Sequence, residues 1–286
     1  MVQPDTYSPT VSLVVPAKNE AKNLREVLPQ LPSLHEVILV DGNSTDETIR
    51  AARDVLPDIR VVRQTRKGKG NALSAGFLAA TGDIVVMFDA DGSADPAEIP
   101  MFVEALVNGA DFAKGSRFAA GGGSDDITLL RSAGNALLNL VANVAFRTRF
   151  TDLCYGYNAF WRKHLPVLDL PGPDLPAPAS GMLWGDGFEI ETLIHCRFAA
   201  ARVSITEVPS TELPRLHGQS NLRTFSDGMR VLRTIVAERH RQRRRRPTGQ
   251  VASMGQARSH RQGAGPASGR HLDVVPPLDD LQEKSA

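Results

Sequence analysis

The sequence has 286 residues, of which 42% are hydrophobic and 23% are charged, and its formal net charge is +1. A chain of this length and composition holds one large domain or two small ones, and such a composition excludes disorder throughout. The near-neutral balance gives no overall field that would attract nucleic acid, although residues 239–246 alone contain six arginines.

The cysteine count and the N-terminal residues indicate the cellular compartment of the protein. Only Cys154 and Cys196 are present, which excludes a disulfide framework or a cysteine-based zinc site and is typical of a reducing compartment. The first ten residues have neither the basic start nor the apolar core of a signal peptide. No stretch reaches the roughly 18 to 20 apolar residues of a membrane span. We therefore expect a cytoplasmic protein without a transmembrane segment, able to lie peripherally on the membrane.

Short apolar runs alternate with helical patterns through the first half of the chain. Strands are expected at 11–15, 36–40, 59–62 and 83–88, which are brief and rich in β-branched residues. Helices are expected around 19–31, 41–56 and 70–80 and from about Pro96, with Thr45 or Asp46 capping the second one. This alternation predicts a single α/β domain over residues 9–246, with a Rossmann-like, mainly parallel sheet flanked by helices.

Polar loops follow three of these strands. They are PAKNE (16–20), DGNSTD (41–46) and DADGSAD (89–95). Asp, Asn, Ser and Gly are ordinary turn residues, so turn chemistry alone explains any one loop equally well. Because ligands bind at the carboxyl ends of parallel strands, three such loops together favour a binding site.

The third loop contains a D-x-D pattern in which Asp89 and Asp91 flank Ala90. Two carboxylates held close together repel each other, and a divalent cation relieves that repulsion. Oxygen ligands suit Mg²⁺ or Mn²⁺, which also bind phosphate oxygens. On spacing alone the pattern also describes solvated turn carboxylates. Its position directly after a buried strand favours a metal site.

Longer runs of sequence, spread over roughly residues 9 to 235, resemble those of a known protein family and occur in the same order. They are VSLVVPAKNEAKNL, VILVDGNSTDET, KGKGNALSAGF, GDIVVMFDADGSADP, FAKGSRF, RSAGNALLNL, TDLCYGYNAFWR, GFEIE and EVPSTELPRLHGQSNL. In these runs the sequence resembles the inverting glycosyltransferases of family 2, which have the GT-A fold. Within that family it is most similar to the dolichol-phosphate or polyprenyl-phosphate mannose and glucose synthases.

The resemblance implies a set of residues that bind the sugar donor. Asp41 resembles the acid that contacts the nucleotide base or ribose, and Asp89 and Asp91 match the metal-binding D-x-D. The full donor-binding set is Pro16, Ala17, Asn19, Glu20, Asp41, Lys69, Gly70, Asp89, Ala90, Asp91 and Arg117.

Catalytic and acceptor residues are implied in the same way. The catalytic set is Asp89, Asp91, Arg117, Arg131 and Asp152, and the acceptor or phosphate set is Arg131, Glu191, Arg215 and Ser220. Arg215 and Ser220 match an R-x-x-G-x-S element that closes over phosphates, although Asn221 stands where a lysine is frequent. Asp152 would need to accept a proton only if the acceptor were a hydroxyl. Arg131 also fits a solvated position near a helix start, and Glu191 a packing or surface role.

The function that the resemblance implies is metal-dependent transfer of mannose or glucose, with inversion. The donor would be GDP-mannose or UDP-glucose, the acceptor a polyprenyl phosphate and the cofactor Mg²⁺ or Mn²⁺. A soluble hydroxyl acceptor, such as a natural product or a saccharide, is the first alternative. The others are a nucleotidyltransferase, which would favour a Gly/Arg-rich first loop, and a nucleotide-sugar binder without turnover.

The C-terminal part predicts a helix over about 221–246 and a disordered tail over 247–286. Apolar residues recur near one face of the helix, at Phe225, Met229, Leu232, Ile235 and Val236. Its basic end suits an anionic membrane surface, and a helix packed on the domain with a solvated charge run explains it equally well. No aromatic platform for nucleic acid accompanies the arginines.

Two further patterns are set aside. The GKGNAL run has Leu73 where a dinucleotide-binding fingerprint needs a small residue. His195, beside Cys196, is predicted to pack in the core. The oligomeric state is left open.

Overall fold

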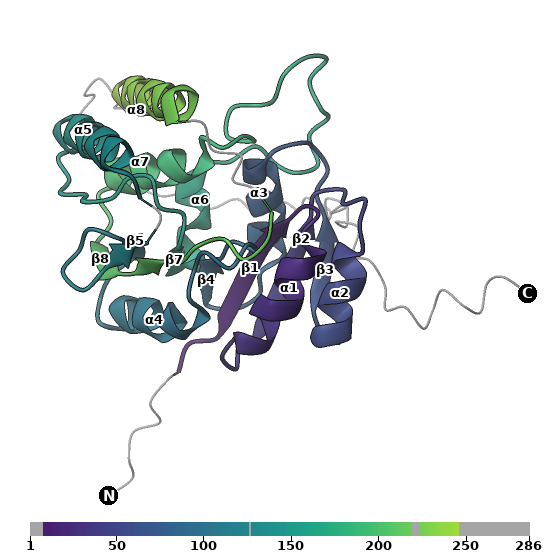
Figure 1. Ribbon diagram of the computed structural model, residues 1–286. Coiled ribbons are helices and arrows are strands. Elements are labelled where there is room, and N and C mark those ends of the chain that lie inside the picture. The colour runs from purple at the N-terminus through teal and green to yellow at the C-terminus, as the bar shows by residue number, and fades with distance from the viewer. Residues whose placement is uncertain (1–7, 126, 219–223, 246–286) are drawn as a thin grey trace, which may run out of the picture.

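The computed structural model describes residues 8–125, 127–218 and 224–245. A seven-stranded sheet, in the order β3-β2-β1-β4-β7-β5-β8, runs through the middle of the domain (Figure 1). Its strands are β1 (Val11–Ala17), β2 (Glu36–Asp41), β3 (Arg60–Arg63), β4 (Ile84–Met87), β5 (Phe112–Ser116), β7 (Asn158–Trp161) and β8 (Ile205–Pro209). A second sheet pairs β6 (Gly123–Ser124) with β9 (Thr211–Glu212).

Every neighbouring pair in the large sheet is parallel except those that β7 makes. That strand runs antiparallel to both β4 and β5. The register sets Ala17 of β1 beside Asp41 of β2, and Val14 of β1 beside Met87 of β4. The first, second and third polar loops therefore leave the sheet at one edge, as the sequence predicts.

Helices cover both faces of the sheet (Figure 1). They are α1 (Ala21–Val27), α2 (Thr48–Val55), α3 (Lys69–Ala79), α4 (Ile99–Val107), α5 (Leu129–Phe146), α6 (Leu165–Leu168), α7 (Ile190–Ala201) and α8 (Thr224–Arg245). Short 3₁₀ turns lie at η1 (Leu28–Gln30), η2 (Pro96–Glu98) and η3 (Arg162–His164).

The pleat of β1 divides its apolar side chains between two cores. Leu13 and Val15 pack into one cluster with residues of α1, α2 and α4. Val14 packs on the other face, in a cluster with residues of α3, α6 and α7. Successive strand residues point to opposite faces, so a strand that is apolar throughout indicates a sheet buried on both sides. Burial of each such side chain stabilises the fold by about 1.5–3 kcal/mol.

A third cluster joins α5 and α8 to α7. It contains Leu138 and Phe146 of α5, Cys196 of α7 and Ile235 of α8. His195 is fully buried, and burial drives its pKa well below the usual value, which keeps the ring neutral. The prediction that His195 packs in the core is confirmed.

Local expectations are met within a residue or two at most boundaries. The cap expected for the second helix is wrong: Glu47 stands at its N-cap without a side-chain capping bond, and Oδ1 of Asp46 accepts from the N–H of Thr48 at 3.0 Å just before it. Along the last helix Ile235 is buried, whereas Met229 and Val236 are about half exposed, so the domain covers only part of its apolar positions. Residues 1–7 and the tail from 247 lie outside the described residues.

Within residues 8–125, 127–218 and 224–245, no helix is both long and apolar enough to cross a membrane.

Candidate active site

The first two polar loops are tied to each other at the edge of the sheet. Asn19, which has a left-handed backbone (φ 59°), accepts from the N–H of Thr45 at 2.8 Å, and its own N–H donates to Oγ of Ser44 at 3.0 Å. Asn tolerates this conformation better than most residues. The buried carboxylate of Asp41 accepts from the N–H of Ser44. The loops expected to bind the nucleotide therefore form one connected unit.

A lysine connects the D-x-D loop to α7. The ammonium of Lys69, at the start of α3, lies 2.7 Å from Oδ1 of Asp89 and 2.6 Å from Oε1 of Glu191. These residues come from three elements far apart in the sequence, and all three side chains are mostly shielded from water. The structure thus brings Glu191 into the same cluster as the D-x-D.

The protonation of this cluster follows from its charges. Burial raises the pKa of Asp89, as do the carboxylates of Glu191 and Asp91, while Lys69 works in the opposite direction. Burial also disfavours the charged form of Lys69, but Asp89 and Glu191 outweigh it and raise the pKa of the ammonium. Lys69 therefore stays charged at neutral pH and holds together carboxylates that would otherwise repel.

The segment that contains Arg215 lies against the other half of the D-x-D. Nη1 of Arg215 is 3.2 Å from Oδ2 of Asp91, and Nη2 forms an ion pair with Glu20 of the first loop. The N–H of Leu216 donates to the carbonyl of Asp91 at 3.1 Å. Oδ1 of Asp91 accepts from the hydroxyl of Ser93 at 2.7 Å. The R-x-x-G segment thus covers the carboxyl edge of the sheet.

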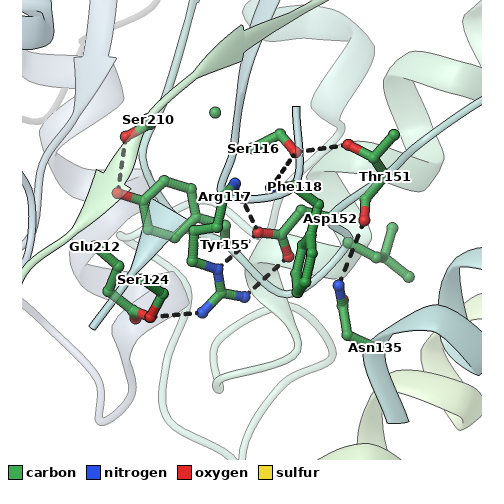
Figure 2. Close-up of polar contacts among 12 residues, drawn as sticks. Ser116, Arg117, Phe118, Ser124, Asn135, Thr151, Asp152, Tyr155, Ser210 and Glu212 are labelled. Carbon is green, nitrogen blue, oxygen red and sulfur yellow. Dashed lines mark hydrogen bonds and ion pairs between the residues drawn. The ribbon is translucent and has the colours of Figure 1, made fainter. Parts of the chain in front are cut away.

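Arg117 and Asp152 form a second group (Figure 2). Nε and Nη2 of Arg117 contact the two oxygens of Asp152 at 2.7 and 2.9 Å, and the backbone N–H of Arg117 adds a third bond at 3.1 Å. Asp152 is fully buried. Nη1 of Arg117 reaches Glu212 at 2.8 Å, and the guanidinium lies 5.0 Å from the ring centre of Tyr155. Burial disfavours the charged form of Arg117, but Asp152 and Glu212 outweigh it and raise the pKa of the guanidinium.

Strand β9 connects the two groups. Glu212 contacts Arg117 through its side chain and forms a bridge with Ala94 beyond the D-x-D. The next residue, Leu213, donates its N–H to the carbonyl of Ser93 at 2.9 Å. Two consecutive residues, Glu212 and Leu213, therefore join the two groups.

The KG motif lies under a loop that precedes α7. The N–H of Gly70 donates to the carbonyl of Asp186 at 2.8 Å, and a Cβ at Gly70 would lie 1.8 Å from the carbonyl oxygen of Gly185. Arg66 and Asp186 form a buried, bidentate ion pair at 2.7 and 2.8 Å. Glycine at position 70 is thus required for close approach of two backbones.

The carboxylates of the D-x-D suit a divalent metal that is also coordinated by phosphate oxygens. Among the described residues, no three His, Cys, Asp or Glu side chains converge as a metal cluster. Asp89 and Asp91 are hard oxygen donors at a partly open edge, and Mg²⁺ usually takes only one or two carboxylates together with waters and substrate phosphates. The residues present therefore fit such an ion.

The structure gives less for two of the expected residues. Arg131 lies in the first turn of α5, where its N–H donates to Oγ1 of Thr128 at 3.3 Å. Ser220 lies outside the described residues. Sequence reasoning missed Glu212, whose contacts with Arg117 and Ala94 arise only when β9 returns to the D-x-D loop. It also missed Ser93, whose hydroxyl donates to Asp91 within that loop. The second glutamate of the EVPSTEL run (207–213) was the only signal for Glu212.

Several curated relatives of the chain are named as polyprenyl-phosphate sugar transferases. A dolichol-phosphate mannosyltransferase of Pyrococcus furiosus is 30% identical over 223 residues, covering 74% of this chain and 59% of the relative. An undecaprenyl-phosphate mannosyltransferase of Micrococcus luteus is 31% identical over 226 residues, covering 74% of this chain and 87% of the relative. An uncharacterized glycosyltransferase of Mycobacterium tuberculosis is 42% identical over 107 residues, and the chain covers 48% of its length. The chain thus spans only about half to three fifths of the archaeal and mycobacterial relatives.

Solved structures show the fold. A crystal structure of glucosyl-3-phosphoglycerate synthase from Mycobacterium tuberculosis, in complex with Mn²⁺, UDP-glucose and phosphoglyceric acid, aligns with a TM-score of 0.60. The identity is 23%, and the alignment covers 96% of this chain and 92% of the other. At this identity the structural similarity supports the GT-A fold and does not indicate the substrate of this chain.

The family match covers the loops described above. Residues 12–166, more than half of the chain, match the family described as "Glycosyl transferase family 2". This region contains the first loop, Asp41, the KG motif, the D-x-D and the Arg117–Asp152 pair. The chain belongs to glycosyl transferase family 2.

Proposed function

We propose that the protein transfers a hexose, mannose or glucose, from a nucleotide diphosphate sugar to a polyprenyl phosphate, with inversion and with Mg²⁺ or Mn²⁺ as cofactor. The observation that carries the proposal is the meeting of Asp89 and Asp91 with Lys69 and Arg215 at the carboxyl edge of the sheet. Family membership supports sugar transfer, and the names of the mannosyltransferase relatives support the acceptor class.

The donor would lie across the edge formed by the first two loops and the D-x-D. Its nucleoside would sit by Asp41, and its diphosphate beside Asp89 and Asp91. Lys69 and Arg215 are cations already held at this edge, so their positions cost little reorganisation when negative charge develops on the diphosphate. Arg215 would exchange its carboxylate partners for phosphate oxygens, which its planar guanidinium matches well.

In the reaction, an oxygen of the acceptor phosphate attacks the anomeric carbon from the face opposite the diphosphate. The bond from that carbon to the diphosphate oxygen breaks, and its electron pair leaves with the nucleoside diphosphate. When bound to Asp89 and Asp91, a divalent metal supplies charge stabilisation to the leaving diphosphate. The acceptor phosphate is already anionic at neutral pH, so the reaction needs no strong general base.

This chemistry fits the state of Asp152. Asp152 is fully buried, and Arg117 binds both of its carboxylate oxygens. Such a carboxylate is better suited to orienting Arg117 than to taking a proton from an acceptor hydroxyl. The pair therefore supports a phosphate acceptor over a hydroxyl acceptor.

Donor binding tests the proposal without any acceptor. Titration calorimetry with GDP-mannose and with UDP-glucose, each with Mn²⁺ or with chelator, would identify the nucleotide. We expect one donor to bind in the presence of Mn²⁺ and to lose most of that binding with chelator or in Asp91→Asn. Equal binding of the donor by Asp91→Asn in Mn²⁺ would contradict the assignment of the D-x-D.

A further inference from the structure

Helix α5 has an apolar face that no part of the described protein covers. On its inner side, Leu138, Ala142 and Phe146 are buried against α7 and α8. On its outer side, aliphatic side chains are largely exposed: Leu129 (91%), Leu130 (58%), Leu137 (62%), Leu140 (60%) and Val144 (74%). Leu130, Leu137 and Val144 recur every seven residues, which places them along one stripe of the helix.

This stripe differs from an exposed apolar residue that stands alone on its helix. Helix α3, for example, exposes one large aliphatic side chain, Leu78, at 59%. Scattered exposed residues of that kind are normal on a soluble surface, whereas a contiguous apolar stripe marks an interaction surface. The exposed apolar stripe of α5 therefore indicates a surface that another molecule covers.

The charged side chains of α5 and of the segment just after it have a single sign. Between Thr128 and Phe150 the sequence contains three arginines and no aspartate or glutamate. Arg147 and Arg149, just past the end of α5, are exposed. The neighbouring α8, which packs beside α5 on the outside of α7 (Figure 1), exposes Arg233 and Arg243. Exposed arginines thus flank the apolar stripe.

We propose that the outer face of α5 docks on an anionic lipid surface. The helix would lie in the plane of the interface, with Leu130, Leu137 and Val144 among the acyl chains and Arg147 and Arg149 at the headgroups. An aliphatic face flanked by arginines is the pattern of an interfacial helix. A second copy of this chain fits less well, because two such faces brought together would oppose arginines with arginines.

The position of α5 gives the docking a consequence for the site, a point that rests on the proposed function. Oδ1 of Asn139 accepts from the N–H of Leu153 at 2.8 Å, and Nδ2 donates to the carbonyl of Thr151 at 2.5 Å. These bonds fix α5 to the segment that carries Asp152. A lipid surface at α5 would therefore hold a membrane-borne acceptor at a set distance from the Arg117–Asp152 pair.

Vesicle sedimentation tests the docking, with the full chain and without any nucleotide sugar. The vesicles are pure phosphatidylcholine, or phosphatidylcholine with roughly one third phosphatidylglycerol. We expect the wild type to bind the anionic vesicles and Leu137→Glu/Val144→Glu to bind them at least about tenfold more weakly. The matched control, Leu78→Glu/Val107→Glu, places the same charges at similarly exposed aliphatic positions on α3 and α4 and should bind as the wild type does.

A second variant separates charge from apolar contact. Arg147→Glu/Arg149→Glu should lose the preference for anionic vesicles while keeping the wild-type melting temperature. Unchanged vesicle binding by Leu137→Glu/Val144→Glu, or no binding by the wild type, would overturn the docking. So would a wild-type dimer that these glutamates make monomeric, since the face would then join two copies. A protein that binds vesicles but transfers no sugar contradicts the proposed function alone, and one that transfers sugar but ignores vesicles contradicts the docking alone.

Discussion

The ammonium of Lys69 lies between the carboxylates of Asp89 and Glu191, at 2.7 and 2.6 Å. A fixed cation thus stands next to the carboxylate pair expected to bind a metal. It lowers the repulsion among Asp89, Asp91 and Glu191, and it competes with any other cation for Asp89. This gives Lys69 two opposed effects, one on the folded site and one on metal affinity.

Replacement of Lys69 by methionine separates these effects. Lys69→Met should bind Mn²⁺ about tenfold more tightly in the absence of donor, because a neighbouring positive charge is worth on the order of 1 kcal/mol or more to an ion at this partly wet site. The variant should also melt at a lower temperature, since its carboxylates lose their partner. Mn²⁺ binding by electron paramagnetic resonance and thermal unfolding measure the two effects.

Lys69→Arg is the matched control, because it keeps the charge. Its Mn²⁺ affinity should stay near that of the wild type. Weaker Mn²⁺ binding by Lys69→Met than by Lys69→Arg would show that the ammonium supports the metal site instead of competing with it.

Arg215 provides a second test. We expect Arg215→Gln to raise the KM for the donor and lower turnover, because the guanidinium is positioned beside Asp91 to bind phosphate oxygens. Its loss should cost the fold only about 0.5–1 kcal/mol, since its ion pairs are partly exposed. Arg50→Gln, on the solvent side of α2, is the control and should leave both kinetic constants unchanged. Equal kinetics for the two variants would remove Arg215 from the donor site.

The Arg117–Asp152 pair is expected to act on stability as well as on activity. Asp152→Asn should destabilise the protein by about 3–5 kcal/mol, because it leaves the guanidinium without its buried partner. The double variant Arg117→Met/Asp152→Leu should recover part of that loss, because no charge remains buried. Urea unfolding measures both. If Asp152→Asn kept its stability and lost only turnover, Asp152 would act as a general base and the acceptor would be a hydroxyl.

We expect opposite effects on stability from alanine at two glycine positions. Gly70→Ala should displace the loop at 185–186 and weaken donor binding, because its Cβ would meet the carbonyl of Gly185 at 1.8 Å. Gly134→Ala, in α5, meets nothing within 4 Å and should stabilise the helix by about 0.5–1 kcal/mol. Thermal unfolding and donor titration compare them. A Gly70→Ala variant with normal stability and donor affinity would show that the loop can move away freely.

The parallel half of the fold could be predicted because local and long-range signals agree there. Strands β1, β2 and β4 are buried on both faces, so their sequences are apolar throughout and end in polar loops. The antiparallel β7 was not foreseen, because NAFW (158–161) is too short to show a direction. Helical periodicity alone does not tell which side of α8 the domain covers, so the exposure of Met229 and Val236 could be read only from the structure.

Some residues of the site could likewise be predicted from local sequence, whereas others could not. Asp89 and Asp91 could be proposed from sequence because they follow one buried strand and lie two residues apart. The Lys69–Glu191 contact joins positions 122 residues apart, and the Arg215–Glu20 contact joins positions 195 apart. No local pattern predicts such pairings, which depend on how the crossovers bring α7 and the 213–218 segment back to the same edge.

The central claim is metal-dependent hexose transfer at the D-x-D. The most direct measurement is sugar transfer by the purified protein in Mn²⁺, with radiolabelled GDP-mannose or UDP-glucose and a polyprenyl phosphate, in parallel with Asp91→Ala. We expect a lipid-extractable sugar phosphate from one donor. Chelator should abolish its formation, and Asp91→Ala should not make it. A folded wild type that binds a donor but gives no lipid product, while it transfers sugar to a soluble hydroxyl acceptor, would contradict the acceptor. A product formed equally well by Asp91→Ala would contradict the site.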